Sequence, residues 1–567
     1  MSGQDGKKFK IIGITLFSIG FLINPLICLR LSHHFLLFST VFFIIGLIFY
    51  IRIFERFGLG KKIIEGIKHL QKNNNWWLLI VQSIIFIFYI GKDKDFLFYQ
   101  ARAGAADEPS YTQFDFSSWE TILGGHRTVG LPLIIKIYFL VFKDLNFWPH
   151  FQMISYVLSI FFLYGCLLKF GFNKMLSLLV VSILLWDESN YRQFMSVATE
   201  CFAATFLHFT VGSLLLAVKR WSWKTAILLG VTVFSLYLVR PNFSFIPVLI
   251  PLWASGISIM REGFNRLRIQ KVILRFSLCA ILPLVLFCLL RLLVVGEFGV
   301  VSMSGGSLAG HAVHFLNENN IQSLTGDVRK LADEILIRKR QLTPPANLSP
   351  FEWMKKVPEQ EKIQMEASAF GGDLMTAWTV AIKQLEGVEP FTDPKFNIEP
   401  WYHTHTLAPF YSRYYSYKTD RLLMRFSKEI LPKEWRRYVH WLVGGTFYGL
   451  SEYWQGWSWL IWLGFLGIAK LFYLEFARGL DGIQLKRWHK EIGILMMIAA
   501  SIFVIGFIPI VAFSFPQPRL MSLIGIYILP GITCLALPPF WLKEEATHEC
   551  NAPIKQEESK MELAIDG

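Results

Sequence analysis

Two adjacent acids, Asp107 and Glu108, follow soon after a strongly apolar segment of the chain. A carboxylate near a membrane surface can take a proton from an attacking hydroxyl group, or it can hold a cation. Tyr111 and the basic pair His126 and Arg127 follow in the stretches DEPSY and GGHRTVGLPLI. The acids are a candidate base and the basic side chains are candidate donors to an anion. The alternative interpretation is a loop of solvated polar residues.

Three further charged residues, Glu200, Arg240 and Arg519, stand at the ends of apolar segments. A carboxylate within an apolar helix costs several kcal/mol unless it is paired, which makes Glu200 a functional candidate. An arginine at the mouth of a span either snorkels to the interface or binds an anion, because guanidinium matches phosphate in a bidentate fork. The arginines therefore fit an anionic headgroup.

Apolar runs make up most of the chain between these residues. The 567 residues are 53% hydrophobic, 16% aromatic and 17% charged. Runs of roughly 18 or more apolar residues recur, and each can cross a hydrocarbon core of ~30 Å. The sequence predicts an all-α polytopic membrane protein with about twelve transmembrane helices (roughly 11 to 13). The expected spans are 11–29, 35–53, 76–91, 150–168, 175–187, 196–218, 225–239, 243–260, 275–295, 457–475, 492–514 and 520–541.

Lysine and arginine gather in alternate connections between the expected spans. Because cytoplasmic loops collect these residues, both termini are expected in the cytoplasm of a multi-pass cell (inner) membrane protein. The net charge of +14 then reflects topology and not a nucleic-acid partner. The first apolar run lacks a small-residue cleavage site and is expected to stay as a helix. The seven cysteines form no CxxC motif, so neither a zinc site nor a disulfide framework is indicated.

The same orientation gives the expected domain organisation. Two long segments fall on the extracytoplasmic face, and the larger is expected to be a mainly helical domain that caps the membrane. Within it, 441–450 is either a surface segment or an additional short span. The regions are 1–75 (two additional N-terminal spans and a basic cytoplasmic loop), 76–295 (a transmembrane core with the first outer loop at 92–149), 296–456 (the extracytoplasmic domain), 457–541 (C-terminal spans) and 542–567 (a polar cytoplasmic tail).

In this order and on this face, the residues resemble the GT-C glycosyltransferases that use polyprenyl-phosphate-linked sugars. The relatives include the protein O-mannosyltransferases and the lipid A aminoarabinose transferases. Thr128 and Leu131 stand where that family favours Pro and Tyr. The resemblance covers roughly residues 76 to 310 and the PQPRL stretch that contains Arg519. The matching residues are Asp107 and Tyr111 in the first outer loop, Arg127, Gly130 and Pro132 after it, Ser196 and Glu200 on a later helix, and Arg240 with Pro241.

The resemblance implies a GT-C-like core and an inverting transfer of a sugar from a polyprenyl-phosphate donor. Asp107 would act as the general base toward a hydroxyl of an envelope lipid, glycan or protein acceptor. Arg127, Arg240 or Arg519 would stabilise the departing lipid phosphate. The resemblance also implies substrate-binding roles for Glu108, Tyr111, His126 and Glu200. A divalent cation, Mg²⁺ or Mn²⁺, held by Glu108 is left open, and no metal ligand is assigned.

Three other classes of protein compete with this interpretation. An oligosaccharide polymerase or ligase of the envelope would act on a longer lipid-linked donor. A transporter or flippase for lipid-linked glycans would carry charged residues within several spans and two matched halves. A structural assembly protein would need no catalytic residues. The YHTH motif at 402–405 resembles a metal-binding pair, but two histidines in an aromatic loop more often bind no metal.

Overall fold

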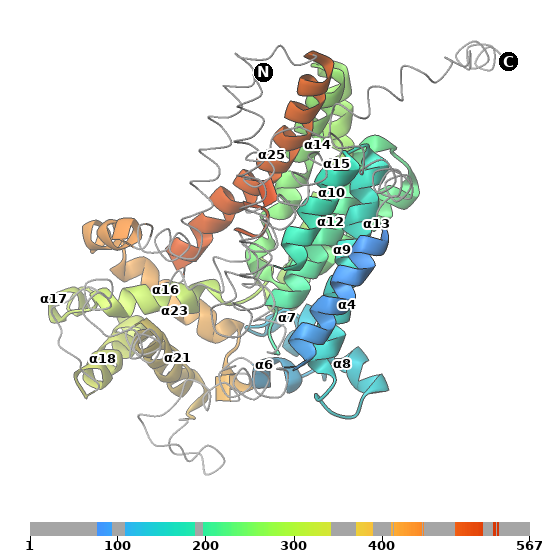
Figure 1. Cartoon of the computed structure of the whole chain (residues 1–567). Helices are drawn as coiled ribbons and strands as arrows, with labels where there is room; N and C mark the ends of the chain where they lie inside the picture. The colour runs from blue at the N-terminus through green and yellow to red at the C-terminus, as the bar shows by residue number, and fades with distance from the viewer. Residues whose placement is uncertain are drawn as a thin grey trace, which may run out of the picture.

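The structure is a computed structural model that describes 76–92, 108–186, 197–341, 370–388, 410–411, 413–444, 446, 482–513, 525–528 and 530–531. Within these ranges the fold is helical and contains no β-strand, although an isolated antiparallel bridge joins Gly125 to Ser416. Figure 1 shows a bundle of long helices and a second, smaller group of helices near one end of it.

Five helical segments of the described chain are long and apolar enough to cross a membrane. Shorter apolar helices accompany them: α4 (Trp76–Lys92), α8 (Gly130–Val141), α10 (Lys174–Leu185) and α13 (Trp223–Val239). These helices support a membrane protein, whereas the predicted spans at 11–29, 35–53 and 457–475 lie outside the described residues. Three of the five long segments are the single helices α9 (Trp148–Phe170), α12 (Glu200–Lys219) and α15 (Arg266–Val295). The fourth, Pro241–Glu262, consists of η2 (Pro241–Phe243) and α14 (Ile246–Glu262). The fifth is His489–Ile508, which lies within α25 (Gly482–Phe513).

Helix α12 packs against both α9 and α13, and α14 packs against α15. Local sequence sets the end of α9, which stops at Gly171; the φ of 112° at Gly171 is a left-handed value that glycine adopts without a Cβ clash.

On α15, Leu274, Leu278, Leu282 and Leu286 form an exposed stripe at a spacing of four residues. Such a stripe is expected on a helix that faces lipid and not water.

Helix α8 is an apolar element that the prediction left inside the outer loop at 92–149. It contains 12 residues, and at 1.5 Å per residue it is about 18 Å long, too short to cross a hydrocarbon core. Leu133, Ile137 and Leu140 are exposed on it. The apolar segment is therefore a half-length helix, and it contacts α13. Helix α15 also begins earlier than its predicted span, at Arg266, where Asn265 caps its first turn.

The second group has a hydrophobic core of its own, which includes Leu331, Leu423 and Phe426. Gly305 lies against α23, because a Cβ there would come within 2.0 Å of the Asp420 carbonyl oxygen. Helix α16 also contacts α25 of the bundle. The described part of 296–456 is thus helical and packs on the bundle. The group consists of α16 (Ser304–Phe315), α17 (Glu318–Ile321), α18 (Gly326–Gln341), α21 (Phe370–Glu386), α23 (Tyr417–Ile430) and a helix at 435–444.

Candidate functional site

A buried ion pair joins two of the predicted site residues, Glu200 and Arg240. The Arg240 Nη1 atom lies 3.0 Å from Glu200 Oε1, and the two side chains are 9% and 5% exposed. The same Nη1 donates a hydrogen bond of 2.7 Å to Thr199 Oγ1. Arg240 follows α13 in an extended conformation, with φ −139° and ψ 101°, because the next residue is Pro241 and the residue before a proline avoids the helical region.

The pair explains how charges are tolerated at this end of the bundle. Desolvation of a lone ion costs several kcal/mol, and a partner at hydrogen-bond distance offsets much of that cost. Glu200 is the first residue of α12, so its carboxylate also lies at the positive end of a helix dipole. The sequence indicated both charges but not their contact. It also missed Thr199, whose only sequence signal is its place next to Glu200.

A second contact forms within the first loop, by which we mean residues 108–127. Arg127 Nε donates a hydrogen bond of 3.1 Å to Ser110 Oγ, and the guanidinium lies 5.1 Å from the centroid of the Tyr111 ring. Ser110 and Tyr111 are buried in α6 (Glu108–Thr112), which contacts α8. The structure thus brings together Arg127 and Tyr111, two of the predicted site residues.

Gly130 brings the end of the first loop to the ion pair. A Cβ on Gly130 would lie 2.4 Å from both the carbonyl carbon and the carbonyl oxygen of Leu238, so any larger residue would clash with the backbone. Arg127 stands shortly before Gly130, and Arg240 stands shortly after Leu238. The close approach of α8 to α13 therefore places both arginine-bearing corners at one end of the bundle.

His126 lies where the first loop meets the second group. Its ring is buried, and its centroid lies 5.6 Å from that of Tyr415 and 6.3 Å from that of Trp378. Trp378 lies on α21, and Tyr415 precedes α23. His126 therefore contacts the aromatic side chains of the second group, and this contact joins the first loop to that group.

Further polar contacts hold the loop in this position. Arg291, buried on α15, donates from Nε to the Leu123 carbonyl oxygen at 2.7 Å and from Nη2 to Ser302 Oγ at 2.6 Å. Tyr417 donates to Glu120 Oε1 at 3.2 Å. The loop, the end of α15 and the second group thus meet in one packed region. These contacts hold the second group against one end of the bundle.

Asp420 is a buried acid that sequence reasoning did not select. Its Oδ1 accepts hydrogen bonds from the Gly306 backbone N–H at 2.9 Å and from the Tyr415 hydroxyl at 2.8 Å. Burial raises the pKa of the Asp420 carboxyl, and these two hydrogen bonds oppose that rise. Burial beside this carboxyl also raises the pKa of Tyr415. The sequence signal that could have identified Asp420 is its position on the apolar face of α23, which it shares with Leu423 and Ile430.

Of the remaining predicted residues, the structure describes only Glu108. Glu108 begins α6 and is half-buried. Asp107 and Arg519 lie outside the described residues, as does the YHTH motif at 402–405. Among the residues that the structure describes, no group of three or more His, Cys, Asp or Glu side chains could hold a metal ion.

Comparisons of the chain with the models of protein families, with curated proteins and with solved structures give no match. What the described corner can bind is therefore indicated only by its own chemistry. A corner with two arginines, a buried acid, a tyrosine and a helix N-terminus can bind an anion at the end of an apolar bundle.

Proposed function

We propose that this protein is a membrane glycosyltransferase that moves a hexosyl or pentosyl group from polyprenyl phosphate to an acceptor on the extracytoplasmic face. The acceptor is an envelope lipid, a glycan or a protein. The close approach of Gly130 to Leu238 carries most weight, because it brings the Arg127 and Arg240 corners to one end of an apolar bundle. A donor with a phosphate headgroup and a prenyl chain needs cationic donors next to an apolar surface.

In the proposed reaction the acceptor hydroxyl oxygen attacks the anomeric carbon, and the bond from that carbon to the phosphate oxygen breaks. Asp107 takes the hydroxyl proton, and polyprenyl phosphate leaves with the bonding electron pair. Arg127 and Arg240 stabilise the negative charge that develops on the phosphate. A guanidinium has five N–H donors, more than the contacts of Arg240 Nη1 with Glu200 and Thr199 use. Glu200 would hold Arg240 in the orientation that the phosphate requires.

The transporter alternative has one observation in its favour. His208 lies fully buried in the middle of α12, where its Nδ1 is 3.1 Å from Ser159 Oγ of α9. Gln152 is also fully buried on α9. Polar side chains inside spanning helices often mark a transport path. A transporter would move a lipid-linked glycan across the bilayer without forming a new glycosidic bond, and an assay of bond formation separates the two classes.

The decisive experiment replaces Asp107 by Asn in the full chain. A general base contributes roughly 10²–10⁴ in rate, so sugar transfer from a prenyl-phosphate sugar in membranes should fall by about that factor while donor binding persists. Glu108→Gln is the matched control and should retain most activity. Normal transfer by the Asp107→Asn protein would refute the assigned base. Loss in both variants that added Mg²⁺ or Mn²⁺ restores would assign the acidic pair to a metal.

A further inference from the structure

The helix at 435–444, which follows α23 in the second group, carries an exposed apolar stripe. Trp435, Val439 and Val443 are 56%, 44% and 49% exposed. Residues four apart lie above one another on a helix, so these three side chains form a single line. A line of this kind on a domain in water would expose apolar surface without a compensating contact.

The opposite face of this helix packs on α16. The Trp441 ring is buried, and its centroid lies 4.1 Å from that of His311. The Tyr438 ring centroid lies 5.6 Å from that of His311 and 6.3 Å from that of Phe315. These contacts fix which face of the helix is turned inward. The apolar stripe is consequently turned away from the core of the second group.

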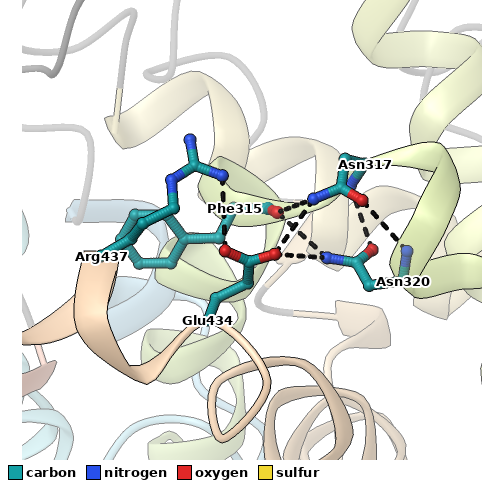
Figure 2. A network of polar contacts seen from close by, with 5 residues as sticks. All are labelled: Phe315, Asn317, Asn320, Glu434 and Arg437. Atoms are coloured by element: carbon teal, nitrogen blue, oxygen red, sulfur yellow. Dashed lines mark hydrogen bonds and ion pairs between the residues drawn. The ribbon is translucent and has the colours of Figure 1, made fainter.

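A polar network anchors the start of the helix, as Figure 2 shows. Glu434 Oε1 accepts hydrogen bonds from Asn317 Nδ2 at 3.1 Å and from Asn320 Nδ2 at 3.4 Å. Arg437 Nη1 lies 3.5 Å from Glu434 Oε2, and its guanidinium lies 5.4 Å from the centroid of the Phe315 ring. The two asparagines also cap α17 through a reciprocal capping box. With both its start and its inner face held, the helix cannot rotate to hide the stripe without breaking this network.

Basic side chains border the stripe. Lys433, Arg436 and His440 are exposed, and the Arg436 guanidinium lies 5.6 Å from the centroid of the Trp435 ring. A tryptophan with arginine beside it and valines along one face is typical of a helix in the interfacial plane of a membrane. Each Lys or Arg near an anionic bilayer contributes to binding, and its aliphatic stem can lie along the apolar layer.

The position of the helix in the fold agrees with such a role. Helix α16, on which it packs, also contacts α25, whose segment His489–Ile508 can span a membrane. In Figure 1 the orange ribbon of 435–444 lies at the edge of the second group, at about the height of the lower end of α25. A bilayer around α25 would therefore have its surface near this helix.

We propose that the helix at 435–444 lies in the headgroup layer of an anionic bilayer, with Trp435, Val439 and Val443 directed toward the acyl chains. The second group is then held on the membrane at a second point in addition to its contacts with the bundle. This proposal does not depend on the reaction proposed above.

The test uses the full chain in nanodiscs that contain phosphatidylglycerol. Single cysteines at positions 435, 439 and 443 receive a nitroxide label, and the signal of the labelled parent chain is subtracted. Power saturation should show all three labels accessible to oxygen and protected from a water-soluble nickel reagent, at similar depths of about 5–10 Å. The control is a label at Leu385, which is 42% exposed on α21 and should face water.

A second arm of the experiment tests whether the positive charges beside the stripe hold the helix on anionic lipid. Lys433→Gln with Arg436→Gln should bring the labels closer to water, whereas Arg436→Lys should preserve their depth. Arg425→Gln, an exposed change on α23, is the matched control and should have no effect. Labels that contact water as freely as the one at Leu385 would overturn the proposal. A depth that increases by about 1.5 Å per residue from 435 to 443 would also overturn it, because this is the pattern of a spanning helix. Equal depth in the charge variants would refute the anionic lipid as partner.

Discussion

Arg240 and Glu200 form an ion pair of 3.0 Å between the end of α13 and the start of α12, in a place where both side chains are almost fully buried. The contact joins consecutive helices at the end of the bundle where the first loop returns. It also makes each charge dependent on the other, because the loss of either side chain would remove an ion-pair partner from a buried charge.

The first prediction concerns this pair. Glu200→Gln and Arg240→Met should each lower the free energy of unfolding by about 3–5 kcal/mol, since each leaves a buried charge without its partner. The double variant should cost less than the sum of the two changes. Thermal unfolding in detergent measures this coupling. Strictly additive effects would contradict a direct interaction between the two charges.

The second prediction tests the close approach of α8 to α13. Gly130→Ala should shift α8 and lower sugar transfer, because its Cβ would lie 2.4 Å from the Leu238 carbonyl group. Gly125→Ala is the control, since its Cβ would meet no atom closer than 3.4 Å and its φ is −68°. We expect a loss of transfer of at least about tenfold for the first change, equivalent to 1.4 kcal/mol in the barrier, and near-normal transfer for the second. Equal activities would show that this contact does not position the site.

The third prediction concerns the buried Asp420. Its folded-state pKa is raised above the unfolded value, so the folded protein binds this proton more tightly. The resulting stability is fully present below the unfolded pKa and is lost as the pH rises through the folded pKa. Asp420→Asn keeps an acceptor for Gly306 and Tyr415 and should remove this decline. Melting temperatures measured from below the unfolded pKa to above the folded pKa of this carboxyl show whether the decline in stability is present.

Asp420→Ala provides the contrast. It leaves the Gly306 N–H and the Tyr415 hydroxyl without their acceptor, and an unsatisfied buried group costs about 1–3 kcal/mol. The alanine variant should therefore be less stable than the asparagine variant at every pH. Equal stability of the two variants would mean that these hydrogen bonds contribute nothing.

The fourth prediction tests how the first loop attaches to the second group. His126→Ala removes the ring that contacts Tyr415 and Trp378, so the backbone amides of 119–127 should exchange hydrogen faster. Trp119→Ala, which changes an exposed side chain of the same loop, should leave exchange at 120–127 close to that of the parent. Exchange mass spectrometry gives the readout. Unchanged protection after His126→Ala would assign the attachment to Arg291 and the Gly125–Ser416 bridge instead.

The sequence by itself determined the helical membrane character of this protein and the kinds of side chain available to its site. A run of apolar residues long enough to cross a bilayer forms a helix because no water is present to satisfy its backbone, so the spans around α9, α12 and α15 could be predicted locally. Pro241 and Gly171 likewise set their helix ends through local backbone restrictions. Asp107 and Arg519 stay predictions from the sequence.

Tertiary structure alone decided which of these side chains meet. Arg240 reaches Glu200 and Thr199, and His126 packs against the aromatic side chains of the second group. Helical period and hydropathy describe each segment separately, whereas these contacts depend on the packing of segments far apart in the chain. Gly130 shows the physical reason most directly: its missing side chain permits one backbone to touch another, and the sequence does not reveal which backbone that is.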